Sequence, residues 1–194
     1  MNPWVAICAL LGLGAAGLAW ALGPVADPRL HPLAWSALSW LSRPWTLWTS
    51  AWVNTSPGQY AGNLLALLAL AVAGAWLKAG RAAALALLAA WPLGIAALAL
   101  WPGVGHYSGL GGPIHAAAMV LWAHLALHQE HKPLSFVLFA GMVLKLGVER
   151  AWVYPVSFDP GWGFNVVFAA HLTGAVAGAV CGLLAVLLPG RPAR

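Results

Sequence analysis

Residues 166–188 read VVFAAHLTGAVAGAVCGLLAVLL, an apolar run that contains His171. A helix needs about 20 mostly apolar residues to span the hydrocarbon core of a bilayer, and this run is long enough. Gly174, Gly178 and Gly182 recur at every fourth residue and therefore share one face of a helix. Small residues in this spacing let a second helix approach closely. The run predicts a transmembrane helix that packs tightly against a neighbour.

The whole chain has the composition of a membrane protein. Of its 194 residues, 62% are hydrophobic and only 7% are charged, which excludes both a water-soluble globule and a disordered chain. The net charge of +5 comes from basic residues scattered among the loops. This distribution favours the orientation of loops in a membrane over nucleic-acid binding. We therefore expect the lipid bilayer, and no nucleic acid, to surround most of the chain.

Five further apolar runs resemble the first one. They lie at 4–22, 60–77, 82–100, 112–127 and 134–148. The sequence thus predicts an all-α integral membrane protein with six transmembrane helices in one domain, residues 1–194. The alternative for the first run is a signal peptide, but no Lys or Arg precedes it and it is longer than a typical signal core, which favours a membrane anchor.

The segment 23–59, between the first two predicted helices, is neither a short loop nor a charged domain. It contains five tryptophans: Trp35, Trp40, Trp45, Trp48 and Trp52. Tryptophan prefers the headgroup level, where its ring is in an apolar layer and its N–H meets water. We therefore expect a loop that is partly embedded in the membrane.

The basic residues predict the orientation of the chain. If the loop between the second and third helices is cytoplasmic, five basic residues lie on that side and three lie outside. The five are Lys78, Arg81, Lys132, Arg191 and Arg194, and the three are Arg29, Arg43 and Arg150. Cytoplasmic loops carry an excess of Lys and Arg, so we expect a multi-pass protein with both termini in the cytoplasm.

Polar groups are costly at membrane depth, and the few in this chain are candidates for function. Gln59 and Asn63 are four residues apart and share a helix face. The fourth predicted helix begins with SGLGGPIH, residues 108–115, and its proline stands in the first turn, where a helix accepts proline. Free N–H groups around Gly111 and Gly112 can hold an oxyanion there. The alternative for each polar residue is an interhelical hydrogen bond.

Three motifs together resemble those of the rhomboid intramembrane serine proteases. Gly109-Leu110-Gly111-Gly112 stands where rhomboids have Gly-x-Ser-Gly, and His171 with Gly174 and Gly178 matches their His-x-x-Gly-x-x-x-Gly. The block from Trp45-Thr46-Leu47-Trp48-Thr49 through Asn63 is similar to their first loop and second helix. The resemblance covers nearly the whole chain and implies the six-helix rhomboid fold.

The rhombosortase branch of this family is the most similar, through His115 and through Lys145 with Glu149. The resemblance implies a bacterial-type inner (plasma) membrane, partner proteins with C-terminal transmembrane anchors, no cofactor and no metal. It also implies an oxyanion and substrate-binding site around the nucleophile position. The residues that it assigns to this site are Gln59, Asn63, Gly109, Gly112 and His115.

The chain departs from the rhomboid pattern at three positions. Gly111 replaces the nucleophilic serine, Gln59 replaces a histidine of the second helix, and Asn54 replaces a histidine of the first loop. A glycine has no side chain to attack a carbonyl, so His171 is a base without a nucleophile to activate. We therefore expect a catalytically impaired homologue that binds transmembrane segments or C-terminal anchors of client proteins.

One alternative is an active intramembrane serine endopeptidase. It requires either that Ser108 acts as the nucleophile or that the natural residue at position 111 is serine. Ser108 lies three residues before Gly111, and an extended chain of that length reaches about 10 Å. A nucleophile must lie within about 3 Å of its base, which argues against Ser108.

A second alternative is a membrane protein that binds a metal or haem through His124 and His128, which are spaced to chelate one ion. Against it, histidines with partial positive charge are also stabilised at the C-terminal end of a helix, where the helix dipole is negative. Lys145 and Glu149 have the same four-residue spacing and can simply neutralise each other.

Overall fold

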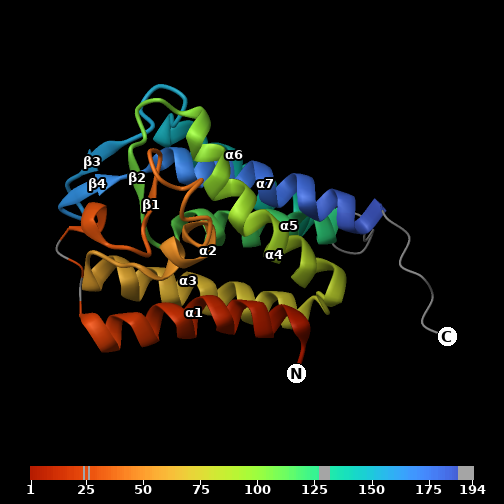
Figure 1. The fold of residues 1–194 in the computed structure, drawn as a ribbon. Coiled ribbons are helices and arrows are strands. Elements are labelled where there is room, and N and C mark those ends of the chain that lie inside the picture. Colours follow the sequence, from red (N-terminus) through yellow and green to blue (C-terminus); the bar gives the residue numbers. More distant parts are fainter. Residues whose placement is uncertain (24, 26, 127–131, 188–194) are drawn as a thin grey trace.

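The computed structural model describes residues 1–23, 25, 27–126 and 132–187 (Figure 1). The fold is mostly helical, at 69%. Four helices are long and apolar enough to cross a membrane, which confirms four of the predicted runs and indicates a membrane protein. They are α1 (Pro3–Leu22), α3 (Pro57–Trp76), α4 (Arg81–Ala96) with its continuation η3 (Ala97–Leu100), and α7 (Phe168–Leu187).

The other two predicted runs correspond to α5 (Gly111–Ala126) and α6 (Lys132–Glu149). Within the described residues α5 has 16 residues, fewer than a full span requires. Helix α6 has 18 residues and includes Lys132, Lys145 and Glu149. Most side chains of α5 are buried, whereas few of α6 are. The two helices thus differ in their surroundings: α5 lies inside the bundle and α6 lies at its surface.

Two small sheets lie at the end of the bundle where α5 and α7 begin (Figure 1). In the first, β1 pairs antiparallel with β2, Trp35 opposite Tyr107; in the second, β3 pairs antiparallel with β4, Phe158 opposite Asn165. The bounds of the short elements are η1 (Pro28–Leu30), β1 (Trp35–Ser36), α2 (Thr46–Thr49), η2 (Ser50–Trp52), β2 (His106–Tyr107), β3 (Ser157–Asp159) and β4 (Phe164–Val166). Both sheets therefore border the first turns of α5 and α7.

The glycine face of α7 packs directly on the backbone of α5, as the sequence predicts. A Cβ atom at Gly174 would collide with the carbonyl of Gly112, and one at Gly178 would collide with the carbonyl of Ala116. At Gly182 a Cβ atom would come within 2.7 Å of the Cβ atom of Ala123. Only glycine permits this approach, so the contact fixes the position of α7 against α5.

The tryptophan-rich segment is folded against the bundle. The side chain of Trp35 is fully buried in the protein core, so this ring contacts protein and not lipid headgroups. Trp45 and Trp48 are 48% and 40% exposed. The Gly109 N–H donates a hydrogen bond of 2.8 Å to the Ser50 carbonyl. This bond connects the segment to the loop that precedes α5.

Candidate functional site

A cavity of about 510 Å³ opens at the end of the bundle where the two sheets lie. Residues from both halves of the chain line it, among them Arg29, Gln59, Ser108, Gly111, Asn165 and His171. Gly111 and His171 belong to the first turns of α5 and α7, which the glycine face of α7 holds together. The cavity therefore contains two of the positions that the sequence analysis assigns to catalysis.

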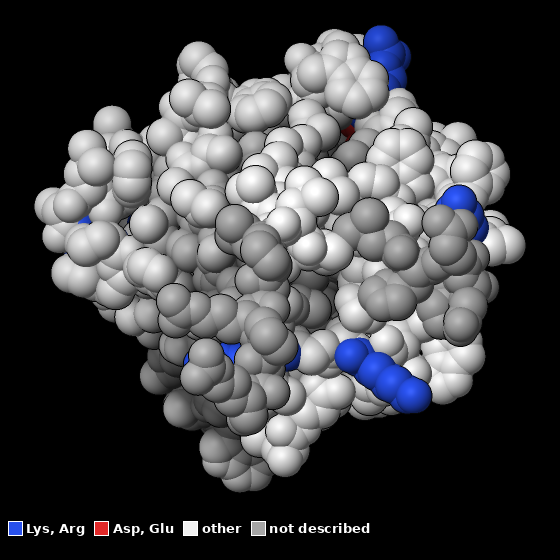
Figure 2. Space-filling model, turned by 90° about the vertical axis from the view of Figure 1, so that its right-hand side faces the viewer, with Lys and Arg blue, Asp and Glu red and all other residues white. Residues whose placement is uncertain are grey.

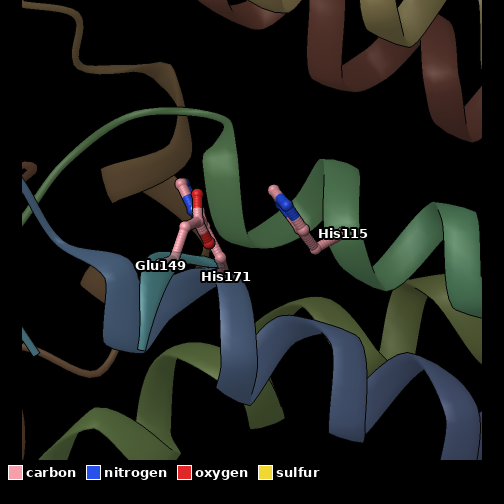
Figure 3. Close-up of side chains that lie close together, drawn as sticks. All are labelled: His115, Glu149 and His171. Carbon is pink, nitrogen blue, oxygen red and sulfur yellow. The ribbon is translucent and has the colours of Figure 1, made fainter. Parts of the chain in front are cut away.

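His171 makes a hydrogen bond to a carboxylate from a different helix. Its Nδ1 lies 2.9 Å and 3.0 Å from the two carboxylate oxygens of Glu149, the last residue of α6. Figure 3 shows the two side chains next to each other. A carboxylate only accepts hydrogen bonds, so the proton of this contact belongs to Nδ1 and the lone pair of the neutral ring is at Nε2. Glu149 thus orients the ring and selects its tautomer, as an acidic residue does beside a catalytic histidine.

Lys145 completes this cluster. Its Nζ lies 2.5 Å from Glu149 Oε1 and 3.3 Å from His171 Nδ1. The expected pairing of Lys145 with Glu149 is confirmed, but Glu149 also binds His171. The sequence predicts the pair of the lysine and the glutamate but not the place of Glu149 in the site. The four-residue spacing signals only the contact within α6, whereas the contact with α7 depends on tertiary packing.

The Nε2 edge of His171 faces Gly111. A Cβ atom at position 111 would lie 2.8 Å from Nε2 and 3.1 Å from Cδ2 of the ring. The structure therefore brings the base position and the predicted nucleophile position into direct contact. Gly111 leaves this ring edge uncovered.

His115 lies one helical turn after Gly111 and is 8% exposed. Its Nδ1 donates to the Gly111 carbonyl at 2.7 Å. Its ring stacks on that of His171, with centroids 4.2 Å apart and planes 13° apart, and in Figure 3 it points from α5 towards the other two side chains. His115 thus packs on one face of the His171 ring.

The N–H of Gly112 is not free to bind an oxyanion, contrary to our expectation. It donates to the hydroxyl of Tyr107 at 2.8 Å, and that hydroxyl donates to the Gly109 carbonyl at 2.7 Å. Tyr107 is 4% exposed, and burial raises the pKa of its hydroxyl. The phenol therefore caps the start of α5. The sequence did not reveal this role, because β2 must pair with β1 before Tyr107 faces the helix.

The amides of α3 differ in position. Gln59 lines the cavity, its Nε2 is 3.9 Å from the Cβ position of Gly109, and its Oε1 accepts from Thr55 Oγ1 at 3.4 Å. Asn63 does not line this cavity, and its Nδ2 is buried without a partner among the described residues. Asn54 contributes to a separate cavity of about 190 Å³. Of the three, only Gln59 can contact a ligand beside His171.

The described residues contain one group that offers metal ligands. His115, Glu149 and His171 each provide a ligand atom, and these atoms lie within 4.8 Å of one another. Two features oppose metal binding: Lys145 Nζ already provides a cation at Glu149, and the stacked rings have nearly parallel planes, so their lone pairs do not converge on one point. The geometry fits a hydrogen-bonded cluster better.

Of the two histidines proposed as an alternative metal or haem site, the structure describes only His124. His124 Nε2 lies 3.1 Å from the Leu77 carbonyl, so this nitrogen is engaged with the end of α3. His128 lies outside the described residues.

No protein-family model matches the chain, and no curated protein matches it. The residues of the cavity and their geometry are therefore the basis for a functional assignment.

Proposed function

We propose that the chain is a six-helix, rhomboid-like intramembrane protein of the rhombosortase kind that lacks the serine nucleophile and binds transmembrane segments or C-terminal anchors of other membrane proteins. The observation that carries this proposal is the His171–Glu149 pair, whose Nε2 edge borders Gly111. A carboxylate-oriented histidine beside the first turn of a helix is the arrangement of a serine hydrolase without its serine. Such a site retains a binding cavity but cannot form an acyl-enzyme at position 111.

The surface of α6 supports its assignment as a membrane span. Five of its large apolar side chains are at least 53% exposed: Phe136, Val137, Val143, Leu144 and Val148. Such a row is unfavourable in water and is matched by lipid. The charges of Lys145 and Glu149 compensate each other near the end of the helix. We therefore assign α5 and α6 as the two remaining spans, with α5 enclosed by protein.

Two basic residues between α3 and α4 support the proposed orientation. Lys78 and Arg81 lie at the junction of α3 and α4, at the end of the bundle opposite the two sheets (Figure 1). Figure 2 shows Lys and Arg side chains scattered among uncharged atoms on this face. Basic residues favour the cytoplasmic side. The cavity end then faces away from the cytoplasm.

The cavity offers hydrogen bonds to an extended chain. Strand β4 pairs with β3 along one edge. All three residues of β4, Phe164, Asn165 and Val166, line the cavity. A two-stranded sheet leaves the second edge of β4 available for backbone hydrogen bonds. Gln59 adds an amide that both donates and accepts. An unwound transmembrane segment needs such partners, because lipid provides none.

Binding is tested with the protein in lipid nanodiscs and a fluorescent peptide that carries Gly-Gly before an apolar segment of about 20 residues. We expect saturable binding, measured as fluorescence anisotropy. The change Gln59→Leu removes one hydrogen-bonding side chain from the cavity and should raise Kd about 3- to 10-fold.

The matched change is Asn63→Leu, which removes an amide one turn further along α3 and outside the cavity. It should leave Kd within about twofold, since it removes no ligand contact. Absence of saturable binding, or equal effects of the two changes, would contradict the proposed function.

A further inference from the structure

The ring edge of His171 that a serine would occupy is open to the cavity. A Cβ atom at position 111 would lie 2.8 Å from Nε2 and would cover this edge. Glycine leaves it uncovered, and both residues line the cavity of about 510 Å³. A nitrogen lone pair that faces a polar cavity accepts a hydrogen bond from water. Water in this cavity thus reaches the base, because position 111 carries no side chain that would cover the ring edge.

The surrounding residues hold His171 in the state that a base requires. Glu149 accepts the Nδ1 proton at 2.9 Å, which leaves the lone pair at Nε2. His115 stacks on the ring at 4.2 Å and restricts its rotation. Lys145 binds Glu149 Oε1, an oxygen that also contacts His171, at 2.5 Å and fixes the carboxylate. These three residues, each from outside α7, hold the ring in one orientation.

We infer that His171, oriented by Glu149, activates water directly, and that the protein hydrolyses carboxylic esters without a covalent intermediate. Nε2 takes a proton from water as the water oxygen forms a bond to the ester carbonyl carbon. The resulting tetrahedral intermediate breaks its bond to the alkoxy oxygen. The imidazolium then gives its proton to the departing oxygen. The products are a carboxylic acid and an alcohol, and the histidine returns to its neutral form.

The oxyanion contacts favour esters over amides as substrates. The Gly112 N–H, which would stabilise an oxyanion at the start of α5, is already bound to Tyr107. Gln59 Nε2 lines the cavity near Gly109 and provides a side-chain donor. With reduced stabilisation of the oxyanion, the more reactive ester carbonyl is the suitable substrate. The inference concerns His171, Glu149 and Gly111 and does not depend on which segment the cavity binds.

The test uses the full chain in nanodiscs with a p-nitrophenyl ester of a medium-length fatty acid as the probe. We expect turnover above that of empty nanodiscs, slower turnover in D₂O, resistance to fluorophosphonate and no acyl adduct by intact-protein mass spectrometry. Absence of turnover by the unmodified protein would overturn the inference. An acyl adduct on Ser108, with loss of turnover in Ser108→Ala, would also overturn it and assign a serine nucleophile instead.

Variants separate the base from its support. His171→Ala should reduce turnover about 100-fold or more, because general-base catalysis contributes that much. Glu149→Gln should shift the pH–rate profile as well as lower the rate, since it changes the tautomer preference of the base. Gly111→Ala should lower the rate at least about 10-fold by covering Nε2. Gly141→Ala is the matched control, because a Cβ atom there contacts nothing within 4 Å; equal rates for Gly111→Ala and Gly141→Ala would contradict the inference.

Discussion

Helix α7 contacts α5 in two different ways along its length. From Gly174 onward the two backbones touch, and a Cβ atom at Gly174 or Gly178 would collide with a carbonyl of α5. One turn earlier, at His171, the neighbour of the α5 backbone is the edge of a side chain, and both border a cavity. Glycine is thus required for packing in the first region, whereas in the second region it leaves an edge of the His171 ring without a side chain against it. The same residue type thus allows close helix packing at one place in this helix pair and leaves a ring edge uncovered at another.

The largest expected effect is at the packed region. Gly178→Ala places a methyl group against the Ala116 carbonyl and backbone, which cannot move without separating the helices. We expect a loss of about 3 kcal/mol in the free energy of unfolding, measured by thermal unfolding in detergent. Gly141→Ala in α6, where a Cβ atom contacts nothing within 4 Å, is the control. A Gly178→Ala protein as stable as its control would show that the two helices do not pack as described.

Tyr107→Phe tests the boundary between the two regions. The phenol accepts from Gly112 and donates to Gly109, and its removal leaves both buried groups without that partner. We expect a loss of about 2 kcal/mol in stability, with the helical content unchanged by circular dichroism. A stability loss near zero would indicate that water or another group already satisfies the start of α5.

Gly111→Ala makes the same glycine-to-alanine change in the second region, beside the cavity. The new methyl group meets the edge of the His171 imidazole, 2.8 Å from Nε2, rather than a backbone carbonyl. A ring can shift by a few tenths of an ångström, so we expect a stability change of about 1 kcal/mol or less. The same unfolding assay gives the comparison. Equal losses for Gly111→Ala and Gly178→Ala would remove the distinction between the two regions.

The smallest effect is at the rim of the cavity. Arg29 donates to both carboxylate oxygens of Asp27, at 2.9 Å and 2.8 Å, and these bonds lower the pKa of Asp27. A carboxyl whose pKa is lowered on folding contributes stability above its ordinary value of about 3.9, and the contribution is lost as the pH falls through the folded value. The pair is at the surface, so the effect is slight.

The measurement is the melting temperature as a function of pH, compared with that of Asp27→Asn. The difference between the two proteins should be present at neutral pH and vanish in acid. A difference that grows on acidification would contradict the assigned pairing.

Part of this structure follows from the sequence alone. Hydropathy predicts α1, α3, α4 and α7 closely, and the spacing of Gly174, Gly178 and Gly182 predicts the tight contact of α7. Local spacing carries this information, because a helix face is defined by residues three and four apart. The same principle predicts the pair of Lys145 and Glu149, four residues apart in α6.

The remaining features depend on contacts between distant segments. Glu149 meets His171 only when the end of α6 approaches the start of α7. Tyr107 faces Gly112 only after β2 pairs with β1, and the same pairing buries Trp35. No sequence spacing encodes these contacts, and the composition of the tryptophan-rich segment does not show which of its rings pack in the protein core.

The most direct test of the account introduces a serine at position 111. Gly111→Ser puts a hydroxyl beside Nε2 of His171, and a fluorophosphonate probe reports only an activated hydroxyl. We expect the Gly111→Ser protein to be labelled, the unmodified protein to remain unlabelled, and the double variant Gly111→Ser, His171→Ala to lose the label. A folded Gly111→Ser protein that does not react, or one that reacts equally without His171, would contradict the claim that this cavity is a serine hydrolase site without its nucleophile.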